Sequence, residues 1–123
     1  MKVFFFILYA LFIVTISILA YLNIIPTKQI TIPYYDLVGH FILYGIWGYL
    51  FAIVFTRPMI NGSKFILPWG IVVVSMITIL EECLQSLSPV RTSSFSDLGC
   101  SMLGIIIALI IFNMKYMISI VIK

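Results

Sequence analysis

Residues 3–25 read VFFFILYALFIVTISILAYLNII, a stretch without a single charged side chain. A helix that crosses the hydrocarbon core of a bilayer needs about 20 consecutive apolar residues, and this stretch exceeds that length. A signal peptide has a shorter apolar region, followed by a cleavage site of small residues, and residues 3–25 show neither feature. We therefore expect a retained transmembrane helix here.

Three further apolar stretches predict three further transmembrane helices. They cover about residues 36–55, 65–87 and 97–114. Pro68 would fall in the first turn of the third helix, where proline is tolerated, and residues 61–64 are expected to form the loop before it. The tail, residues 115–123, should continue the fourth helix or lie at the membrane interface. We thus expect an all-α fold, a four-transmembrane-helix bundle that forms one domain over residues 1–123.

Composition supports this assignment and excludes other classes. Of the 123 residues, 63% are hydrophobic and 9% are charged, whereas soluble domains average about 45–50% apolar and 25% charged residues. Such a chain cannot cover itself with polar surface, so its expected partner is the lipid bilayer. It has no basic run with interleaved aromatic residues, which argues against nucleic-acid binding. Cys83 and Cys100 lack metal-type spacing and are expected to be small buried apolar side chains, although a disulfide stays open.

The placement of charge predicts an orientation. With four spans, one side carries Lys2, Arg57, Lys64, Lys115 and Lys123, and the other carries Lys28 and Arg91. The side richer in Lys and Arg in short loops faces the cytoplasm, so both termini are expected to be cytoplasmic. The acidic residues, together with the only histidine, then fall in the outer half of the molecule. These residues are Asp36, His40, Glu81, Glu82 and Asp97.

Several of these polar residues share helix faces. Asp36, His40 and Tyr44 are spaced i, i+4 and i+8, which places them on one face of the second helix. Glu82 and Gln85, spaced i and i+3, also share a face. Because Glu81 is rotated about 100° from Glu82 around the helix, only one of the two needs to face a common site, and the spacing to Gln85 favours Glu82.

Two further charged residues come from the last loop and the fourth helix. Arg91 follows the third helix in a polar loop, and Asp97 completes Ser94-x-x-Asp97, a capping-box pattern that starts the fourth helix. Ionisable groups within membrane spans are costly and usually face the bundle interior or a wet cavity. His40 and Arg91 lie at the right depth to pair with Glu82. We therefore expect an outer polar pocket formed by these side chains.

Each residue also has a simpler interpretation. Asp36 and Asp97 could be first-turn acids that complement a helix dipole, His40 and Tyr44 could be packing residues, and Arg91 could be a solvated loop charge. Their joint occurrence at one end favours a site. Small residues predict close helix packing as well. They are Gly45 and Gly48 on the second helix and Cys100, Gly104 and Ala108 on the fourth.

These motifs together resemble one family, the VanZ-like membrane proteins. The matching pieces are Asp36-x-x-x-His40-Phe41-x-x-Tyr44, Glu82-x-x-Gln85, Pro89-x-Arg91-Thr92, Asp97-Leu98 and Gly104, over about residues 36–112. The chain has Leu37 where the family often has Lys, and Ser101 where it usually has Asn; Ser101 is shorter but still donates and accepts hydrogen bonds. The resemblance implies a small multi-pass protein of the bacterial cell membrane with a role in resistance to teicoplanin-type glycopeptides. It brings no established mechanism.

Three functions stay open on this basis. In an enzyme acting on a lipid-linked or cell-wall precursor, His40 would be a general acid or base oriented by Asp36 or Glu82. Arg91 would hold a phosphate or carboxylate, and Asp97 or Glu82 would be a second acid–base group or bind a metal. The alternatives are a non-catalytic binder of a head group, a precursor or a glycopeptide, and an accessory subunit of a larger membrane protein.

The remaining candidate residues, Tyr44, Gln85 and Ser101, would contact the ligand in either of the first two functions. The sequence has neither a nucleophile elbow nor an HExxH motif, so the reaction class stays open. We assign no metal ligand and no cofactor from the sequence. The substrate and the oligomeric state also stay open.

Overall fold

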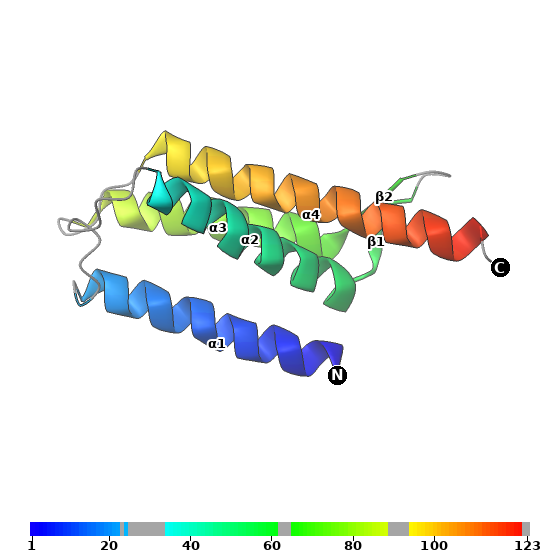
Figure 1. Cartoon of the computed structure of the whole chain (residues 1–123), viewed down its shortest axis with the longest axis horizontal. Coiled ribbons are helices and arrows are strands. Elements are labelled where there is room, and N and C mark those ends of the chain that lie inside the picture. Colours follow the sequence, from blue (N-terminus) through cyan, green and yellow to red (C-terminus); the bar gives the residue numbers. More distant parts are fainter. Residues whose placement is uncertain (23, 25–33, 62–64, 89–93, 122–123) are drawn as a thin grey trace.

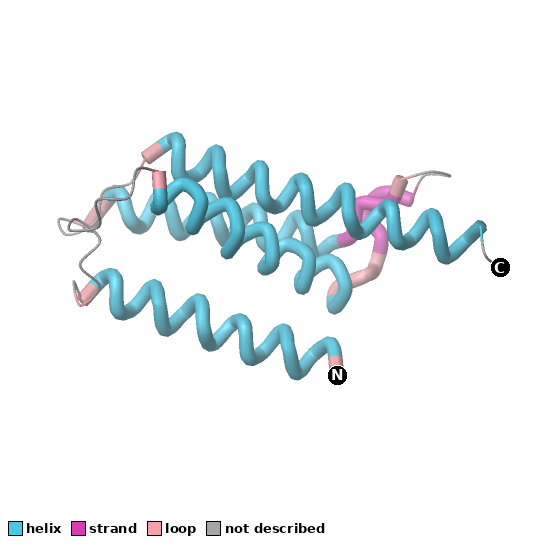
Figure 2. The backbone as a smooth tube through the Cα atoms, viewed as in Figure 1, coloured by secondary structure: helices cyan, strands magenta, loops and turns pink. Residues whose placement is uncertain are grey.

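The computed structural model describes residues 1–22, 24, 34–61, 65–88 and 94–121. In chain order the elements are α1 (Lys2–Tyr21), α2 (Tyr35–Val54), β1 (Pro58–Asn61), β2 (Ile66–Pro68), α3 (Trp69–Ser86) and α4 (Phe95–Val121). The helices alternate in direction, so the N- and C-termini lie at the same end (Figures 1 and 2). The expected all-α fold with four long helices is confirmed, and all four are long and apolar enough to cross a membrane. The tail after residue 114 continues α4.

A short β-hairpin before α3 was not expected. β1 and β2 pair antiparallel, with Asn61 opposite Ile66, so Asn61 belongs to a strand rather than to a loop. The third helix begins at Trp69 rather than near Phe65, and Pro68 precedes it in an extended conformation, with φ −73° and ψ 145°. A residue before proline is driven from the helical to the extended region. This restriction on Leu67 explains why residues 66–68 form a strand rather than the start of the helix.

The side chain of Asn113 fixes this hairpin to α4. Its Oδ1 accepts a hydrogen bond from the backbone N–H of Ile66 at 2.7 Å. Its Nδ2 donates to the carbonyl of Ile66 at 2.9 Å and to that of Leu109, one turn back along α4, at 3.0 Å. Asn113 is 8% exposed, and its amide replaces the strand partner that the edge of β2 would otherwise need.

The most extensive helix contact joins α2 to α4. A Cβ on Gly104 would lie 2.3 Å from the carbonyl oxygen of Phe41, and one on Gly48 would lie 3.4 Å from the Cβ of Ala108. Only a glycine lets the two backbones approach this closely at position 104. The predicted role of the small residues in helix packing is therefore confirmed for Gly45, Gly48, Gly104 and Ala108. This contact fixes α4 against α2.

α1 lies along one side of the other three helices (Figure 1). Aromatic packing holds its first half, where the ring of Phe6 meets that of Phe51 edge-on at 4.9 Å. The hydroxyl of Tyr9 donates to the carbonyl of Leu43 at 2.8 Å. Most other apolar side chains of α1 are exposed. A helix that is apolar all round and still exposed needs an apolar environment to cover it.

The two cysteines are free thiols. Cys100 is half-buried, whereas Cys83 is exposed on α3, so the expectation of two buried side chains is wrong for Cys83. Cys83 lies two residues beyond Glu81 and thus about 200° around the helix from it. Because Glu81 points into the bundle, Cys83 points away from it.

Candidate functional site

A small cavity with several polar side chains in its wall lies between α1, α2 and α3, near the ends of the helices opposite the two termini. Its volume is about 210 Å³. The apolar part of its wall comes mostly from α1. Its polar wall consists of Ser17, Tyr35, Asp36, His40, Tyr44, Glu81 and Gln85. Three of the four helices thus contribute hydrogen-bonding side chains to one cavity.

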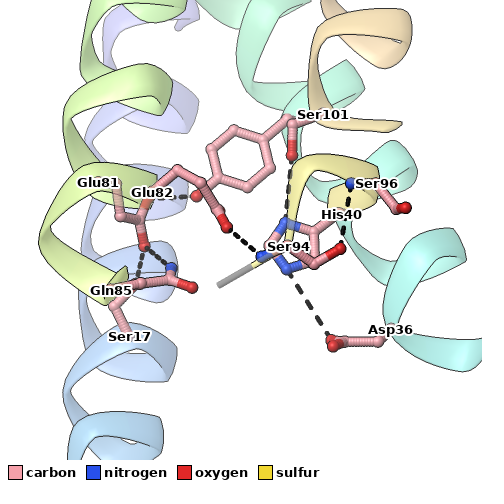
Figure 3. Close-up of polar contacts among 10 residues, drawn as sticks. Ser17, Asp36, His40, Glu81, Glu82, Gln85, Ser94, Ser96 and Ser101 are labelled. Carbon is pink, nitrogen blue, oxygen red and sulfur yellow. Dashed lines mark hydrogen bonds and ion pairs between the residues drawn. The ribbon is translucent and has the colours of Figure 1, made fainter. Parts of the chain in front are cut away.

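The carboxylate of Glu81 connects these three helices. The Tyr44 hydroxyl of α2 donates a hydrogen bond to its Oε2, and the Ser17 hydroxyl of α1 donates to its Oε1 at 3.0 Å. The Gln85 amide approaches the same Oε1 at 3.4 Å from one turn further along α3. Tyr44 and Gln85 are 8% and 2% exposed. Figure 3 shows Glu81, Gln85 and Ser17 converging on this contact. These charged and polar groups lie within membrane-spanning helices, where their exposure to lipid would be energetically costly.

Glu82 points elsewhere. Its Oε1 accepts a hydrogen bond from the backbone N–H of Ser94 at 2.9 Å (Figure 3), directly before α4. From the sequence we chose Glu82 over Glu81 as the partner of Gln85, and the structure places Glu81 there instead. Both i, i+3 and i, i+4 spacings put residues on one face. The positions of α1 and α4 decide between them, and these are not visible in the sequence of α3.

Glu82 also changes the expected cap of α4. As in a capping box, the Ser94 hydroxyl accepts a hydrogen bond from a backbone N–H of the first turn, that of Ser96, at 3.0 Å. The return bond of a capping box would run from the N–H of Ser94 to the side chain of Asp97. Glu82 of α3 takes that N–H instead. Asp97, which is 6% exposed, is thereby directed to other neighbours.

His40 connects the cavity to α4. Its Nδ1 lies 3.1 Å from the hydroxyl of Ser101, and its Nε2 lies 3.9 Å from Oδ1 of Asp36, one turn back along α2 (Figure 3). Its ring stacks on that of Tyr44, with centroids 5.7 Å apart and planes 7° apart. The imidazole is thus held on three sides. One ligand-capable atom each of Asp36, His40 and Asp97 lies within 4.8 Å of the other two.

The structure therefore brings together most of the residues chosen from the sequence. Asp36, His40, Tyr44 and Gln85 line the cavity, and Asp97 and Ser101 of α4 adjoin His40. Glu82 binds the start of α4 instead, and Arg91 lies outside the described residues. The sequence analysis missed Ser17 and passed over Glu81. The i, i+4 spacing of Glu81 and Gln85 was a visible clue to the latter, whereas nothing in α1 distinguishes Ser17 from Thr15.

The described basic residues lie at the opposite end of the bundle (Figure 1). Lys2 begins α1, Arg57 follows α2, and Lys115 lies in the last third of α4. Lys115 contacts the hydroxyl of Tyr49 at 2.8 Å. Within the described parts of the chain, acidic groups and the histidine thus occupy one end, and lysine and arginine occupy the other. No family model matches the chain, and no known curated protein or solved structure is significantly similar to it.

Proposed function

We propose that this chain is a multi-pass protein of the bacterial cell membrane, and that its polar cavity takes up a polar head group at the outer face of the bilayer. The four apolar helices and their exposed apolar side chains support membrane insertion. In lipid every backbone group must be satisfied internally, and long helices meet that requirement. The motifs shared with VanZ-like proteins lead us to propose protection against teicoplanin-type glycopeptides as the biological role.

Charge supports an orientation with both termini in the cytoplasm. The termini share one end of the bundle, and Lys2, Arg57 and Lys115 belong to that end. Lys and Arg in short loops favour the cytoplasmic side. The cavity around Glu81 then opens near the outer leaflet, where lipid-linked cell-wall precursors are used.

The observation that carries the proposal is the convergence of α1, α2 and α3 on Glu81. Hydrogen bonds between transmembrane helices stabilise a protein by only about 0.6 kcal/mol on average. A carboxylate within a span costs more than one such bond returns, so its presence indicates function rather than stability. The cavity of about 210 Å³ is smaller than the roughly 300–1,000 Å³ of sites for drug-sized ligands. It therefore fits one sugar, amine or phosphate group of a precursor rather than a whole glycopeptide.

The surroundings of His40 favour a second candidate, an enzyme acting on such a precursor. An imidazole between a carboxylate and a hydroxyl is a common arrangement for general acid–base catalysis, because the carboxylate orients the ring and stabilises its protonated form. Asp36 and Ser101 have these positions relative to His40. In the binding function the same groups would only form hydrogen bonds with the head group.

Expression in a glycopeptide-susceptible bacterium tests the proposal. Wild-type protein should raise the teicoplanin concentration that stops growth, and a reporter fused after Lys123 should be active in the cytoplasm. His40→Ala at equal membrane abundance should abolish the protection. An unchanged drug susceptibility with wild-type protein would refute the glycopeptide role, and an external C-terminus would refute the outward cavity.

Mass spectrometry of the lipid-linked precursors separates the two candidates. An enzyme changes the mass of a precursor in cells that express wild type and leaves it unchanged with His40→Ala. A binder leaves all precursor masses unchanged while the growth phenotype persists.

A further inference from the structure

Asp36, His40 and Asp97 form a three-residue cluster, which we call the DHD cluster, at the outer end of α2 and α4. One ligand-capable atom of each lies within 4.8 Å of the other two. About 2.0–2.2 Å separates a zinc ion from its nitrogen and oxygen ligands, so ligand atoms around one ion lie about 3.3–3.6 Å apart by tetrahedral geometry. Side-chain rotations that move these atoms by about 1 Å would close the cluster around one ion. The Asp36 side chain, 52% exposed in the first turn of α2, has room to make this movement.

The second observation is the contact between His40 and Ser101. A histidine that binds a metal through one ring nitrogen almost always donates its other N–H to an oxygen, which fixes the tautomer and the ring orientation. Nδ1 of His40 lies 3.1 Å from the hydroxyl of Ser101. Nε2 is the nitrogen on the side of Asp36, at 3.9 Å. The ring is therefore oriented with the correct nitrogen toward the carboxylate.

The third observation is the displaced cap of α4. The backbone N–H of Ser94, which a capping box offers to Asp97, is bonded to Glu82. Instead of closing a capping box, the Asp97 carboxylate lies next to His40 and Asp36. An ion here would be held between two carboxylates, one of them 6% exposed.

We propose that the DHD cluster binds one divalent transition-metal ion, of which Zn²⁺ fits best. Imidazole with carboxylates suits Zn²⁺ better than Mg²⁺, which prefers oxygen ligands only. Three protein ligands leave the fourth zinc position open, as in catalytic zinc sites. Because Asp36 and His40 also line the cavity, an ion held by them would lie beside the proposed head-group site. The inference rests on the proposed function for its biological role, and it makes a phosphate or carboxylate the preferred group.

Titration calorimetry with Zn²⁺ tests the proposal directly. The full chain is purified in detergent through a tag without histidine, in a Cys83→Ser, Cys100→Ser background, so that neither the tag nor a free thiol binds the ion. One equivalent of Zn²⁺ should bind, and Mg²⁺ should bind at least 100-fold more weakly. Asp97→Asn and His40→Gln should each lower the Zn²⁺ affinity at least 100-fold.

Two further variants make the test specific. Ser101→Ala removes only the group that orients His40 and should lower Zn²⁺ affinity about 10–100-fold, as for other outer-shell partners of metal ligands. Glu82→Gln removes a nearby carboxylate outside the DHD cluster and should leave the affinity unchanged. Size-exclusion profiles and thermal unfolding identify any variant that fails to fold. If Asp97→Asn does not fold, His40→Gln and Ser101→Ala decide the question.

The metal site would be overturned if the wild-type protein bound no Zn²⁺. It would also be overturned if a His40→Gln, Asp97→Asn double variant still bound the ion. The drug-susceptibility assay reports on the proposed function separately. Stoichiometric Zn²⁺ binding without protection against teicoplanin refutes the function and leaves the metal site standing. If the wild-type protein protects against teicoplanin, loses that protection in His40→Ala and binds no Zn²⁺, the proposed function stands and the metal site is refuted.

Discussion

The two ends of this bundle bury polar groups for opposite reasons. At the end that carries the termini, Asn113 satisfies the backbone of Ile66 in both directions and also bonds the carbonyl of Leu109. At the other end, the ionisable Glu81 and His40 line a cavity of about 210 Å³, and Asp97 lies beside His40. The amide is neutral and matches its partners, whereas the other end gathers groups that can carry charge.

This difference separates structural from functional polar groups. A neutral amide whose donors and acceptor all find partners stabilises a local structure, here the β-hairpin against α4. Ionisable groups that share a cavity raise the free energy of the folded state, and they persist where binding or catalysis requires them. The comparison predicts that variants at one end change the amount of protein, and that variants at the other change its activity.

The largest effect on protein level is expected in the middle, where α2 and α4 hold the two ends in register. In Gly104→Leu the new side chain must begin where a Cβ lies 2.3 Å from the carbonyl oxygen of Phe41. The helices must separate, and overpacking of this kind costs about 1–3 kcal/mol or more. Immunoblots of membranes should show most of the protein lost. A normal level would mean that the close approach of α2 and α4 is not essential.

Asn113→Leu should have the next largest effect on stability, because it disrupts the contact between the β-hairpin and α4. The substitution keeps the number and branching of side-chain heavy atoms, in a somewhat larger side chain, but leaves the N–H and carbonyl of Ile66 without their side-chain partner. A buried unsatisfied polar group costs about 1–3 kcal/mol. Thermal unfolding in detergent should shift to lower temperature, while drug protection per molecule stays at the wild-type value. A loss of protection without a loss of stability would reverse the roles assigned to the two ends.

The helices were predictable from the sequence because each contains an apolar stretch of membrane-spanning length, and their bounds differ from expectation by only a few residues. The hairpin was not predictable in the same way. Its strands are three and four residues long, too short for an alternating pattern. β2 also depends on Asn113, which follows it by 47 positions in the chain.

The candidate site was predictable in part. The i, i+4 and i+8 spacing placed Asp36, His40 and Tyr44 on one face, and all three line the cavity. The choice between Glu81 and Glu82 depends on which neighbouring helix faces each side of α3. Spacing within one helix cannot decide that choice, because both residues are compatible with a contact to Gln85.

His40→Ala should have a small effect on stability and a complete effect on activity. It removes the contact with Ser101, and interhelical hydrogen bonds in membranes contribute only about 0.6 kcal/mol on average. Membrane abundance should therefore stay near the wild-type level while teicoplanin protection is lost. If the variant disappears from the membrane but the remaining molecules still protect, His40 is a packing residue and the polar end is structural after all.

The smallest effect is expected from Glu82→Gln, which with Glu81→Gln forms a matched pair of neighbouring, isosteric changes. Glu82 accepts one backbone hydrogen bond from Ser94 outside the cavity, and a glutamine oxygen can still accept it. The cost is therefore at most the difference between a charged and a neutral hydrogen bond, about 1 kcal/mol, and protection should be unchanged. Glu81 accepts hydrogen bonds from Tyr44 and Ser17 beside the cavity, so Glu81→Gln should abolish protection at an equal protein level.

Parallel measurements of membrane abundance and drug susceptibility for this pair give the sharpest comparison, since the two changes differ by one position on the same helix. Equal loss of protection in both variants would mean that the charge of α3 matters rather than the geometry of the cavity. If only Glu82→Gln abolished protection, Glu82 would be the residue that faces the site, as the i, i+3 spacing predicted. That result would require α3 to rotate by about 100° relative to its neighbours.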